Sequence, residues 1–323
     1  MRIFYQPTTD PAFNLACEEY LLHHTEDEVL MLWQNAPSII IGKNQNTVAE
    51  INRDFVTDHR IPVIRRLTGG GAVYHDLGNL NYTFIKRHSR DAFNDYRTFA
   101  APVIDLLARF GITATLSGRN DILVDGKKVS GNAQMAHGDS VLHHGTLLFS
   151  SDLTMLSQAL NVHPLKVKSK GVASVRSRVT NLRKYLPDLA IPELNQALVE
   201  AFQEVYGLPA AELQYEDLDQ AAIAEGQARF SAPEWIYGDC RPLAVSREAR
   251  FDWGILRLDH SREDGHIAEA ALWSDGLEGD FLSRVPGLLR GCPLEEKALR
   301  EKLLSDPDST QEAVEGILSL LLT

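Results

Sequence analysis

Three consecutive glycines at positions 69–71 constrain this 323-residue chain more than any other stretch. Consecutive glycines weaken a helix or a strand, so a chain usually carries them where its backbone bends sharply or approaches a ligand closely. The basic pair Arg65–Arg66 precedes them and places positive charge beside bare backbone, and residues 72–75 then have the pattern of a strand. Taken alone, the stretch predicts either a glycine-rich surface turn or a loop that lines a nucleotide-and-acid site.

The sequence 117–134 predicts a β-hairpin that gathers polar side chains. Its Asp-Gly pair lies between two alternating apolar runs, which is a strong signal for a two-residue turn. In the simplest register Asp121 faces Ser130, and residues two apart along a strand share a face. Asp121, Lys128 and Ser130 are therefore expected to project together, as a carboxylate for hydrated magnesium, an amine for phosphate or carboxylate, and a hydroxyl. The alternative is an exposed hairpin whose lysine pair is solvated.

Two further blocks carry polar side chains that fit the same site. The apolar strand 141–149 is interrupted by His143 and His144, and adjacent strand residues face opposite ways. One histidine is therefore expected to pack in the sheet and the other to reach a cleft. The segment 166–184 holds seven basic residues and no acidic one, which is typical of a loop that closes over a polyphosphate or of a merely solvated loop.

Charge is distributed unevenly along the chain. The formal net charge is −12, but residues 1–184 hold 21 Lys and Arg against 17 Asp and Glu, whereas residues 185–323 hold 11 against 27. This break favours two parts with different roles. So acidic a chain is not expected to bind nucleic acid in bulk, whereas a local anion site or an acidic partner protein fits the basic first part.

The cysteines and the absence of apolar spans indicate a cytoplasmic, soluble protein. The three cysteines are widely spaced, which argues against a disulfide framework or a zinc site. The first residues lack the basic and apolar pattern of a signal peptide, and no apolar run is long enough to span a bilayer.

Apolar periodicity and capping signals predict an α+β chain of two parts. Helices are expected over 11–23, 91–110, 152–160, 191–206 and 217–230, and strands over 2–5, 29–33, 38–41, 72–75, 80–85 and 141–149. Residues 251–258 and 266–273 predict an antiparallel pair, followed by two or three short helices. We expect a first domain over 1–242, a linker over 241–250 and a smaller second domain over 249–323.

Five blocks, in this order, resemble the ATP-dependent, two-domain bacterial lipoate–protein ligases. They are RR-x-TGGGAVYHD from Arg65 to Asp76, GRND from Gly118, KVSG from Lys128, HHGTLL from His143, and KG with SVRSRVTNL from Lys170 to Leu182. The glycine block alone is weak evidence, whereas five blocks in order are strong. The resemblance implies a biotin/lipoyl ligase-like catalytic domain, with mixed and antiparallel sheets and flanking helices, and a small α+β accessory domain.

What the resemblance implies is a two-step reaction. Lipoate and ATP, with Mg²⁺, would give lipoyl-adenylate and pyrophosphate, and the lipoyl group would pass to a lysine of an acceptor lipoyl domain. Such acceptors are the E2 subunits of 2-oxoacid dehydrogenases and the glycine cleavage H protein. The chemistry agrees, because attack of a carboxylate on a phosphate joins two anions and needs positive charge to offset their repulsion.

The resemblance also assigns roles residue by residue. Lys128 is the catalytic lysine that contacts the substrate carboxylate and the adenylate phosphate, and Asp121 holds magnesium. The residues implied for lipoate or lipoyl-adenylate are Arg66, Thr68, Gly69, Gly70, Gly71, His75, Asn79, Ser130 and His144. Those implied for ATP or the adenylate are Val73, Tyr74, Asn120, Lys170, Ser174 and Arg176. Thr68 stands where many relatives have serine, and its hydroxyl survives.

Three other functions are weighed against this one. An ATP-independent octanoyl or lipoyl transferase of the same fold needs a cysteine or another acceptor in the site, and Cys17, Cys240 and Cys292 lie outside every block. A biotin ligase has a different glycine–arginine loop. A non-catalytic acyl- or nucleotide-binding module would have lost the set of Lys128, Asp121 and Arg66, which is complete in this sequence.

Overall fold

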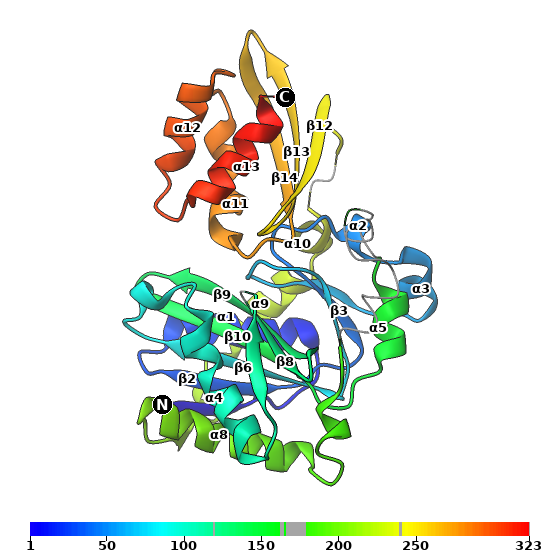
Figure 1. Cartoon of the computed structure of the whole chain (residues 1–323), viewed down its shortest axis with the longest axis vertical. Coiled ribbons are helices and arrows are strands. Elements are labelled where there is room, and N and C mark those ends of the chain that lie inside the picture. The colour runs from blue at the N-terminus through cyan, green and yellow to red at the C-terminus, as the bar shows by residue number, and fades with distance from the viewer. Residues whose placement is uncertain (119, 162–164, 166–178, 239–240, 323) are drawn as a thin grey trace.

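The described residues of the chain form three β-sheets with helices packed around them (Figure 1). The structure is a computed structural model that describes residues 1–118, 120–161, 165, 179–238 and 241–322. The predicted residues Lys170, Ser174 and Arg176, and Cys240, lie outside the described residues. No helix among the described residues is both long enough and apolar enough to cross a membrane.

The largest sheet has eight strands and positions most of the site. Its order is β11-β1-β2-β6-β10-β9-β8-β7, mixed at the β11 end and antiparallel from β2 onward. The strands are β1 (Arg2–Tyr5), β2 (Val29–Trp33), β6 (Asn79–Lys86), β7 (Ala114–Ser117), β8 (Asp121–Val124), β9 (Lys127–His137), β10 (Ser140–Leu148) and β11 (Ala211–Glu212). The expected α+β class is confirmed.

A small three-stranded sheet carries the glycine stretch. Its order is β4-β3-β5, with β3 (Ser38–Ile41), β4 (Val63–Arg65) and β5 (Val73–His75). The glycines at 69–71 lie between β4 and β5. Strands β2 and β3 follow each other along the chain, yet they belong to different sheets, so the turn at 35–37 is a crossing point between sheets.

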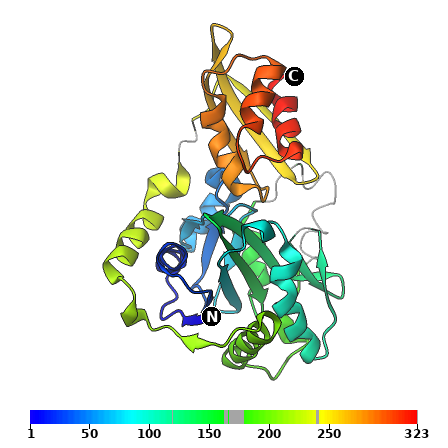
Figure 2. The same cartoon turned by 90° about the vertical axis from the view of Figure 1, so that its left-hand side faces the viewer.

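Helices cover both faces of the large sheet (Figure 2). On one face, α1 (Pro11–His24) and α9 (Gln220–Ser231) contribute to one apolar cluster. On the other face, α4 (Tyr96–Arg109) and α8 (Ile191–Tyr206) contribute to a second cluster. The short helices of this part are α2 (Thr47–Glu50), α3 (Arg53–Asp58), η1 (Arg90–Ala92), α5 (Leu153–Ala159), η2 (Leu182–Lys184), η3 (Tyr215–Asp217) and α10 (Pro233–Tyr237).

Capping residues explain where the helices begin. Asp10 accepts a hydrogen bond from the Phe13 amide and so caps α1. The helix expected over 91–110 begins only at residue 96, because Asp95 caps it and Asn94 just before adopts a left-handed backbone with φ of 71°. The preceding residues form the separate turn η1.

The C-terminal part has its own sheet and its own apolar core. Strands β12 (Val245–Phe251), β13 (Gly254–Glu263) and β14 (His266–Ser274) pack against α11 (Gly279–Leu289), α12 (Glu296–Leu304) and α13 (Gln311–Leu321). The expected linker over 241–250 is wrong in its second half, since those residues form β12. Alternation in this stretch is masked by its charged side chains, which an edge strand tolerates.

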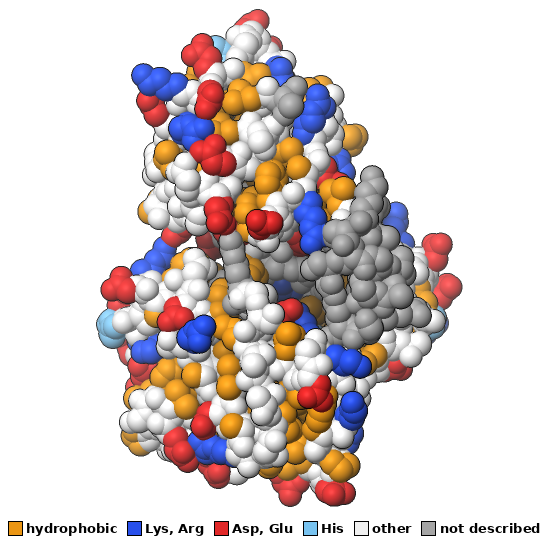
Figure 3. All heavy atoms as spheres, in the orientation of Figure 1, with side chains coloured by type: hydrophobic (Ala, Val, Ile, Leu, Met, Phe, Trp, Pro, Cys, Tyr) orange, Lys and Arg blue, Asp and Glu red, His pale blue; other side chains and the backbone are white. Residues whose placement is uncertain are grey.

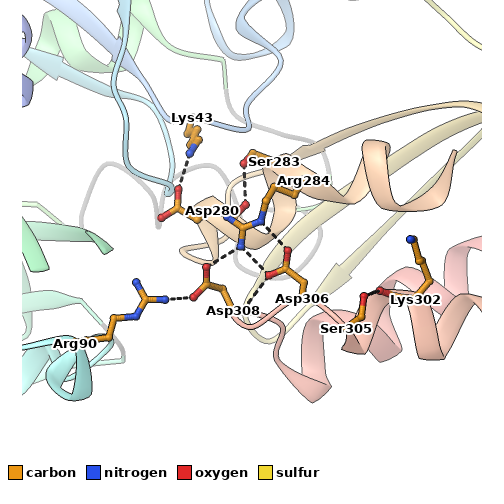
Figure 4. A network of polar contacts seen from close by, with 9 residues as sticks. All are labelled: Lys43, Arg90, Asp280, Ser283, Arg284, Lys302, Ser305, Asp306 and Asp308. Atoms are coloured by element: carbon orange, nitrogen blue, oxygen red, sulfur yellow. Dashed lines mark hydrogen bonds and ion pairs between the residues drawn. The ribbon is translucent and has the colours of Figure 1, made fainter. Parts of the chain in front are cut away.

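The C-terminal part docks on the first through ion pairs and backbone contacts (Figure 4). Lys43 pairs with Asp280 at 2.5 Å. Arg284 binds Asp306 and Asp308 at 2.7 Å each, and Asp308 also pairs with Arg90, so Asp308 connects the two parts. Beside them, the Gly70 amide donates to the Gly276 carbonyl at 2.8 Å, which brings the C-terminal part directly onto the glycine stretch.

Candidate active site

A cavity of about 1200 Å³ lies between the large sheet, the glycine stretch and α5. The molecular surface is hollowed where the C-terminal part meets the larger part (Figure 3). The predicted site residues that line the cavity are Arg66, Gly70, Gly71, Val73, Tyr74, His75, Asn79, Asn120, Lys128 and His144. The structure thus brings together residues from all five sequence blocks, although the fifth lies largely outside the described residues and contributes Val179.

The cavity has an apolar portion as well as a polar one. Leu15, Trp33, Ile40 and Leu148 line it, together with leucines of α5. Leu15 comes from α1, and Trp33 lies at the end of β2, so elements distant in sequence build this wall. A cavity with apolar walls and a few polar groups at fixed positions suits a ligand with a hydrocarbon body and an acidic end.

Arg66 holds the glycine stretch in place. Its side chain is buried, and one guanidinium nitrogen donates to the carbonyls of Gly69 (2.6 Å) and Gly71 (2.9 Å) while Nε donates to the Thr68 hydroxyl (3.0 Å). Burial lowers the pKa of Arg66 to about 10, and the nearby Glu18 carboxylate partly offsets this effect. The Arg66 guanidinium therefore holds the backbone of the glycine stretch in place through its hydrogen bonds to the Gly69 and Gly71 carbonyls.

Arg65 has a purely structural position. Its guanidinium donates to carbonyls of residues 42, 43 and 45 and to the carbonyl of Ile236. Both arginines of the pair are thus buried against backbone carbonyls. The sequence pattern suggested charge available beside the glycines, whereas the structure uses that charge to fix two neighbouring loops.

Lys128 and Asp121 meet at the edge of the cavity. The Lys128 ammonium lies 2.7 Å from an Asp121 carboxylate oxygen, and both side chains are about one-third exposed, at 32% and 36%. Lys128 lies across Gly131, where a Cβ would come within 2.6 Å of Nζ, so the glycine makes room for it. The expected meeting of these two side chains is confirmed.

The expected position of Ser130 is wrong. Lys128 pairs with Leu123 as expected, but a β-bulge then shifts the register, so Asp121 faces Gly131 and Ser130 faces Ile122. The extra residue reverses the alternation of side chains along β9. Ser130 is fully buried and hydrogen-bonded by Asn132, and it does not line the cavity.

Asn120 is fastened to the sheet by Asn132. The Asn120 side chain donates to the Asn132 carbonyl at 2.7 Å, and the Asn132 side chain donates back to the Asn120 carbonyl at 2.9 Å. This reciprocal pair fixes the chain just before Asp121. Asn132 is thus a support of the site that the sequence analysis did not single out.

His144 reaches the cavity and is held by partners on both ring nitrogens. Nδ1 lies 2.9 Å from a carboxylate oxygen of Glu18, and Nε2 lies 2.8 Å from the Thr68 hydroxyl. Thr68 and Gly69 themselves do not line the cavity. Glu18 was also missed by sequence reasoning, although an acidic residue spaced with Leu15 and Leu22 on the apolar face of a helix was a usable signal.

His143 packs on the opposite face of the sheet, as the alternation predicted. Its ring stacks on Phe99 of α4 with centroids 5.1 Å apart, and Gln134 and Asn132 bind its two nitrogens. Burial lowers the pKa of His143 to about 3.

A cluster of polar atoms in the cavity has no protein partner among the described residues. His75 Nε2, Asn79 Oδ1 and Asn81 Nδ2 are all buried in this way. Asn35 contacts the other nitrogen of His75 at 3.0 Å, and burial lowers the pKa of His75 to about 3. Buried polar groups are usually hydrogen-bonded, so this cluster indicates where a ligand supplies the missing partners.

The described residues offer no thiol nucleophile and no dedicated metal centre. Cys17 is buried, and burial raises its pKa to about 11, while Cys292 lies in the C-terminal core. Within the described residues, no three His, Cys, Asp or Glu side chains come together as a metal site. A single carboxylate such as Asp121 still fits Mg²⁺, which keeps several waters and binds through one or two carboxylates plus phosphates.

Sequence profiles of two families match the chain. The profile described as the lipoyl protein ligase A/B catalytic domain matches residues 10–203, and the one described as the bacterial lipoate protein ligase C-terminus matches residues 243–317. Among curated relatives, the chain is 38% identical over 304 residues to the lipoate-protein ligase LplJ of Bacillus subtilis, covering 92% of each chain. It is 36% identical to lipoate–protein ligase 1 of Staphylococcus aureus, covering 91% of this chain and 90% of that one.

Solved structures agree with these matches. The crystal structure of Plasmodium falciparum LipL1 in complex with lipoate superposes with a TM-score of 0.86 at 25% identity, covering 99% of both chains. A lipoate-protein ligase A bound with ATP superposes with a TM-score of 0.64 at 27% identity, covering 73% of this chain and 98% of that one.

Proposed function

The chain belongs to the lipoate–protein ligase family, and we propose that it activates lipoate with ATP and transfers the lipoyl group to a lysine of an acceptor lipoyl domain. The cavity supports this assignment because it joins an apolar wall to a polar end beside the ammonium of Lys128. The observation that carries the proposal is this ammonium, held at the cavity edge by Asp121 at 2.7 Å.

In the first step a lipoate carboxylate oxygen attacks the α-phosphorus of ATP. The new P–O bond forms as the bond to pyrophosphate breaks, and the product is lipoyl-adenylate. Two anions must meet, so a fixed positive group stabilises the transition state more than the separated reactants. Lys128 fills that role, and no side-chain nucleophile takes part.

In the second step the neutral amine of the acceptor lysine attacks the acyl carbon. The C–N bond forms, the bond to AMP breaks so that AMP leaves with the bonding electron pair, and the amine proton passes to water. The mixed anhydride must be kept from water before the acceptor arrives, and the apolar wall of the cavity favours this. The atoms His75 Nε2, Asn79 Oδ1 and Asn81 Nδ2 have no protein partner among the described residues, so they can bind and fix the intermediate.

Asp121, with Asn120 beside it, is the group that would hold Mg²⁺ brought in by the nucleotide. The ion would supply positive charge at the phosphates. Asn132 keeps these two residues in place through its hydrogen bonds with Asn120.

The two parts of the chain have different roles in this proposal. Residues 1–242 bind lipoate and nucleotide and carry out the chemistry, and residues 249–323 form the accessory domain. The acceptor is a lipoyl domain; one structural neighbour comes from an archaeal lipoylation system described as a bi-partite lipoate protein ligase and its E2 lipoyl domain. The acceptors we expect are therefore such E2 domains and the glycine cleavage H protein.

Lipoate-dependent exchange of labelled pyrophosphate into ATP, with magnesium and without acceptor, tests the proposal. Exchange is the expected result, because adenylation is reversible. An ATP-independent transferase or a binding module would give no exchange with lipoate, octanoate or biotin. Neither described cysteine supports the transferase, since both are buried.

A further inference from the structure

We propose that Glu18 is a positioning residue of the site: it fixes His144 in one tautomer and, through His144 and Thr68, holds Arg66 and the glycine stretch in their active arrangement. Glu18 does not line the cavity, so it acts on the substrate only through these neighbours. The part of this inference that concerns activity rests on the proposed function, whereas the part that concerns His144 does not.

Glu18 is a fully buried carboxylate in α1. One oxygen accepts hydrogen bonds from the Thr83 hydroxyl at 2.6 Å and from His144 Nδ1 at 2.9 Å, while the other oxygen has no partner among the described residues. A buried carboxylate with an unused oxygen costs stability, and an apolar side chain would avoid that cost. Its neighbour Glu19 instead pairs with Arg229 near the surface.

Arg66, Thr68, His144 and Glu18 form a series of hydrogen bonds, and the donor of each bond follows from the bond before it. The Thr68 hydroxyl accepts from Arg66 Nε at 3.0 Å, so its own proton is available for His144 Nε2 at 2.8 Å. His144 Nε2 then accepts, which leaves the ring proton on Nδ1 for the Glu18 carboxylate. An ionised carboxylate only accepts, so both ends of the series require the same tautomer.

On the Arg66 side, the series of hydrogen bonds ends at the glycine stretch. Arg66 donates to the carbonyls of Gly69 and Gly71, and the Glu18 charge offsets part of the effect of burial on the Arg66 pKa. Glu18 therefore supports the loop through hydrogen bonds and through charge. Small displacements of groups that position a substrate cost about 100-fold in rate, which sets the expected scale.

On the Glu18 side, the hydrogen bonds continue to the apolar wall of the cavity. Trp33 Nε1 donates to the Thr83 hydroxyl at 3.0 Å, and Thr83 in turn donates to Glu18. Trp33 lines the cavity, so one buried carboxylate connects the apolar wall to the glycine stretch, which lines the same cavity. Loss of Glu18 is therefore expected to raise the KM for lipoate more than the KM for ATP.

The test compares Glu18→Ala and Glu18→Gln with the matched pair Glu19→Ala and Glu19→Gln in the full-length protein. A glutamine oxygen still accepts both hydrogen bonds, so Glu18→Gln should keep exchange within about tenfold of the starting protein. Glu18→Ala should lower kcat/KM for lipoate by about 100-fold. Both Glu19 variants should leave exchange unchanged. Circular dichroism checks that each variant is folded.

A second measurement on the same proteins does not depend on activity. Histidine ¹⁵N chemical shifts report the tautomer, and the His144 signals are assigned by their loss in His144→Gln. We expect the Nδ1–H tautomer in the starting protein and in Glu18→Gln, and its loss in Glu18→Ala. An unchanged tautomer in Glu18→Ala overturns the positioning role, as does a Glu18→Gln protein that keeps the tautomer yet is as slow as Glu18→Ala. Absence of lipoate-dependent exchange in the starting protein overturns only the proposed function.

Discussion

The two faces of the large sheet treat buried polar side chains in opposite ways. On the face covered by α4 and α8, His143 is bonded by Gln134 and Asn132, and the Tyr82 hydroxyl donates to Asn132 at 2.5 Å. On the cavity face, Asn79 and Asn81 of β6, like His75 of the neighbouring strand β5, each keep a buried atom without a partner among the described residues. The polar groups named on the closed face are bonded to one another, whereas those named at the cavity leave places for a ligand.

The neighbouring residues His143 and His144 make the same contrast within one strand. Their side chains point to opposite faces because strand residues alternate. His143 became part of a core, and His144 became part of the site. The difference shows that residue type alone does not identify a functional histidine; the face of the sheet does.

The largest effect is expected from Lys128→Ala. Removal of a charge-stabilising donor costs roughly 3 kcal/mol of transition-state stabilisation, so exchange should fall by about 100- to 1000-fold while the fold is kept. The matched control is Lys127→Ala, because Lys127 is exposed in the same hairpin. Near-normal exchange in Lys128→Ala, or an equal loss in both variants, would contradict the assigned role.

A smaller loss of exchange is expected from Gly279→Ala. A Cβ at this position would lie 2.8 Å from the Gly69 amide nitrogen, so either the glycine stretch or the C-terminal part must move. We expect about tenfold slower exchange. Gly287→Ala on the same helix meets nothing within 4 Å and should not change it. Equal rates in the two variants would mean that the loop does not depend on this contact.

The free energy of unfolding should depend on pH because His75 and His143 each have a pKa near 3 in the folded protein. Their folded pKa values lie below the unfolded value of about 6.5, so the unfolded chain binds more protons and stability falls as the pH falls from 6.5 toward 3. Between pH 6.5 and 5.5 the loss is about 1 kcal/mol for each histidine. Urea unfolding at several pH values measures it, and a His75→Gln variant with the same pH slope as the starting protein would argue against the shift.

Paired substitutions on the two faces should differ in stability. Gln134→Leu leaves the Asn94 amide and His143 without their partner, and we expect a loss of about 2 kcal/mol in the free energy of unfolding. Asn81→Leu leaves the Asn79 amide without its acceptor but also removes a donor that already has no partner, so the expected loss is smaller, about 1 kcal/mol, with weaker lipoate binding. Urea titration and calorimetry compare the two, and equal losses would remove the distinction between the faces.

Local elements were predictable because their signals are local. The Asp125–Gly126 turn formed as expected, with φ of 51° and 71°, and Gly111 ends α4 with φ of 74°. The boundaries of β2, β3 and α8 also follow from periodicity and turn residues. Strand β12 escaped prediction because its charged residues hide the alternation, and the start of α4 was set by Asp95 rather than by the apolar pattern.

By itself, the sequence determined which chemical groups this protein brings to its site: a glycine stretch, a lysine–carboxylate pair and a histidine on an apolar strand. Only the tertiary structure decided how they meet. A single β-bulge turned the Ser130 side chain away from Lys128. The side chains of Arg65 and Arg66 are buried and hold neighbouring loops in place. Helix α1 brought Glu18 to His144 across 126 positions of sequence. Such contacts depend on packing between distant segments, and no local pattern in a single sequence records that packing.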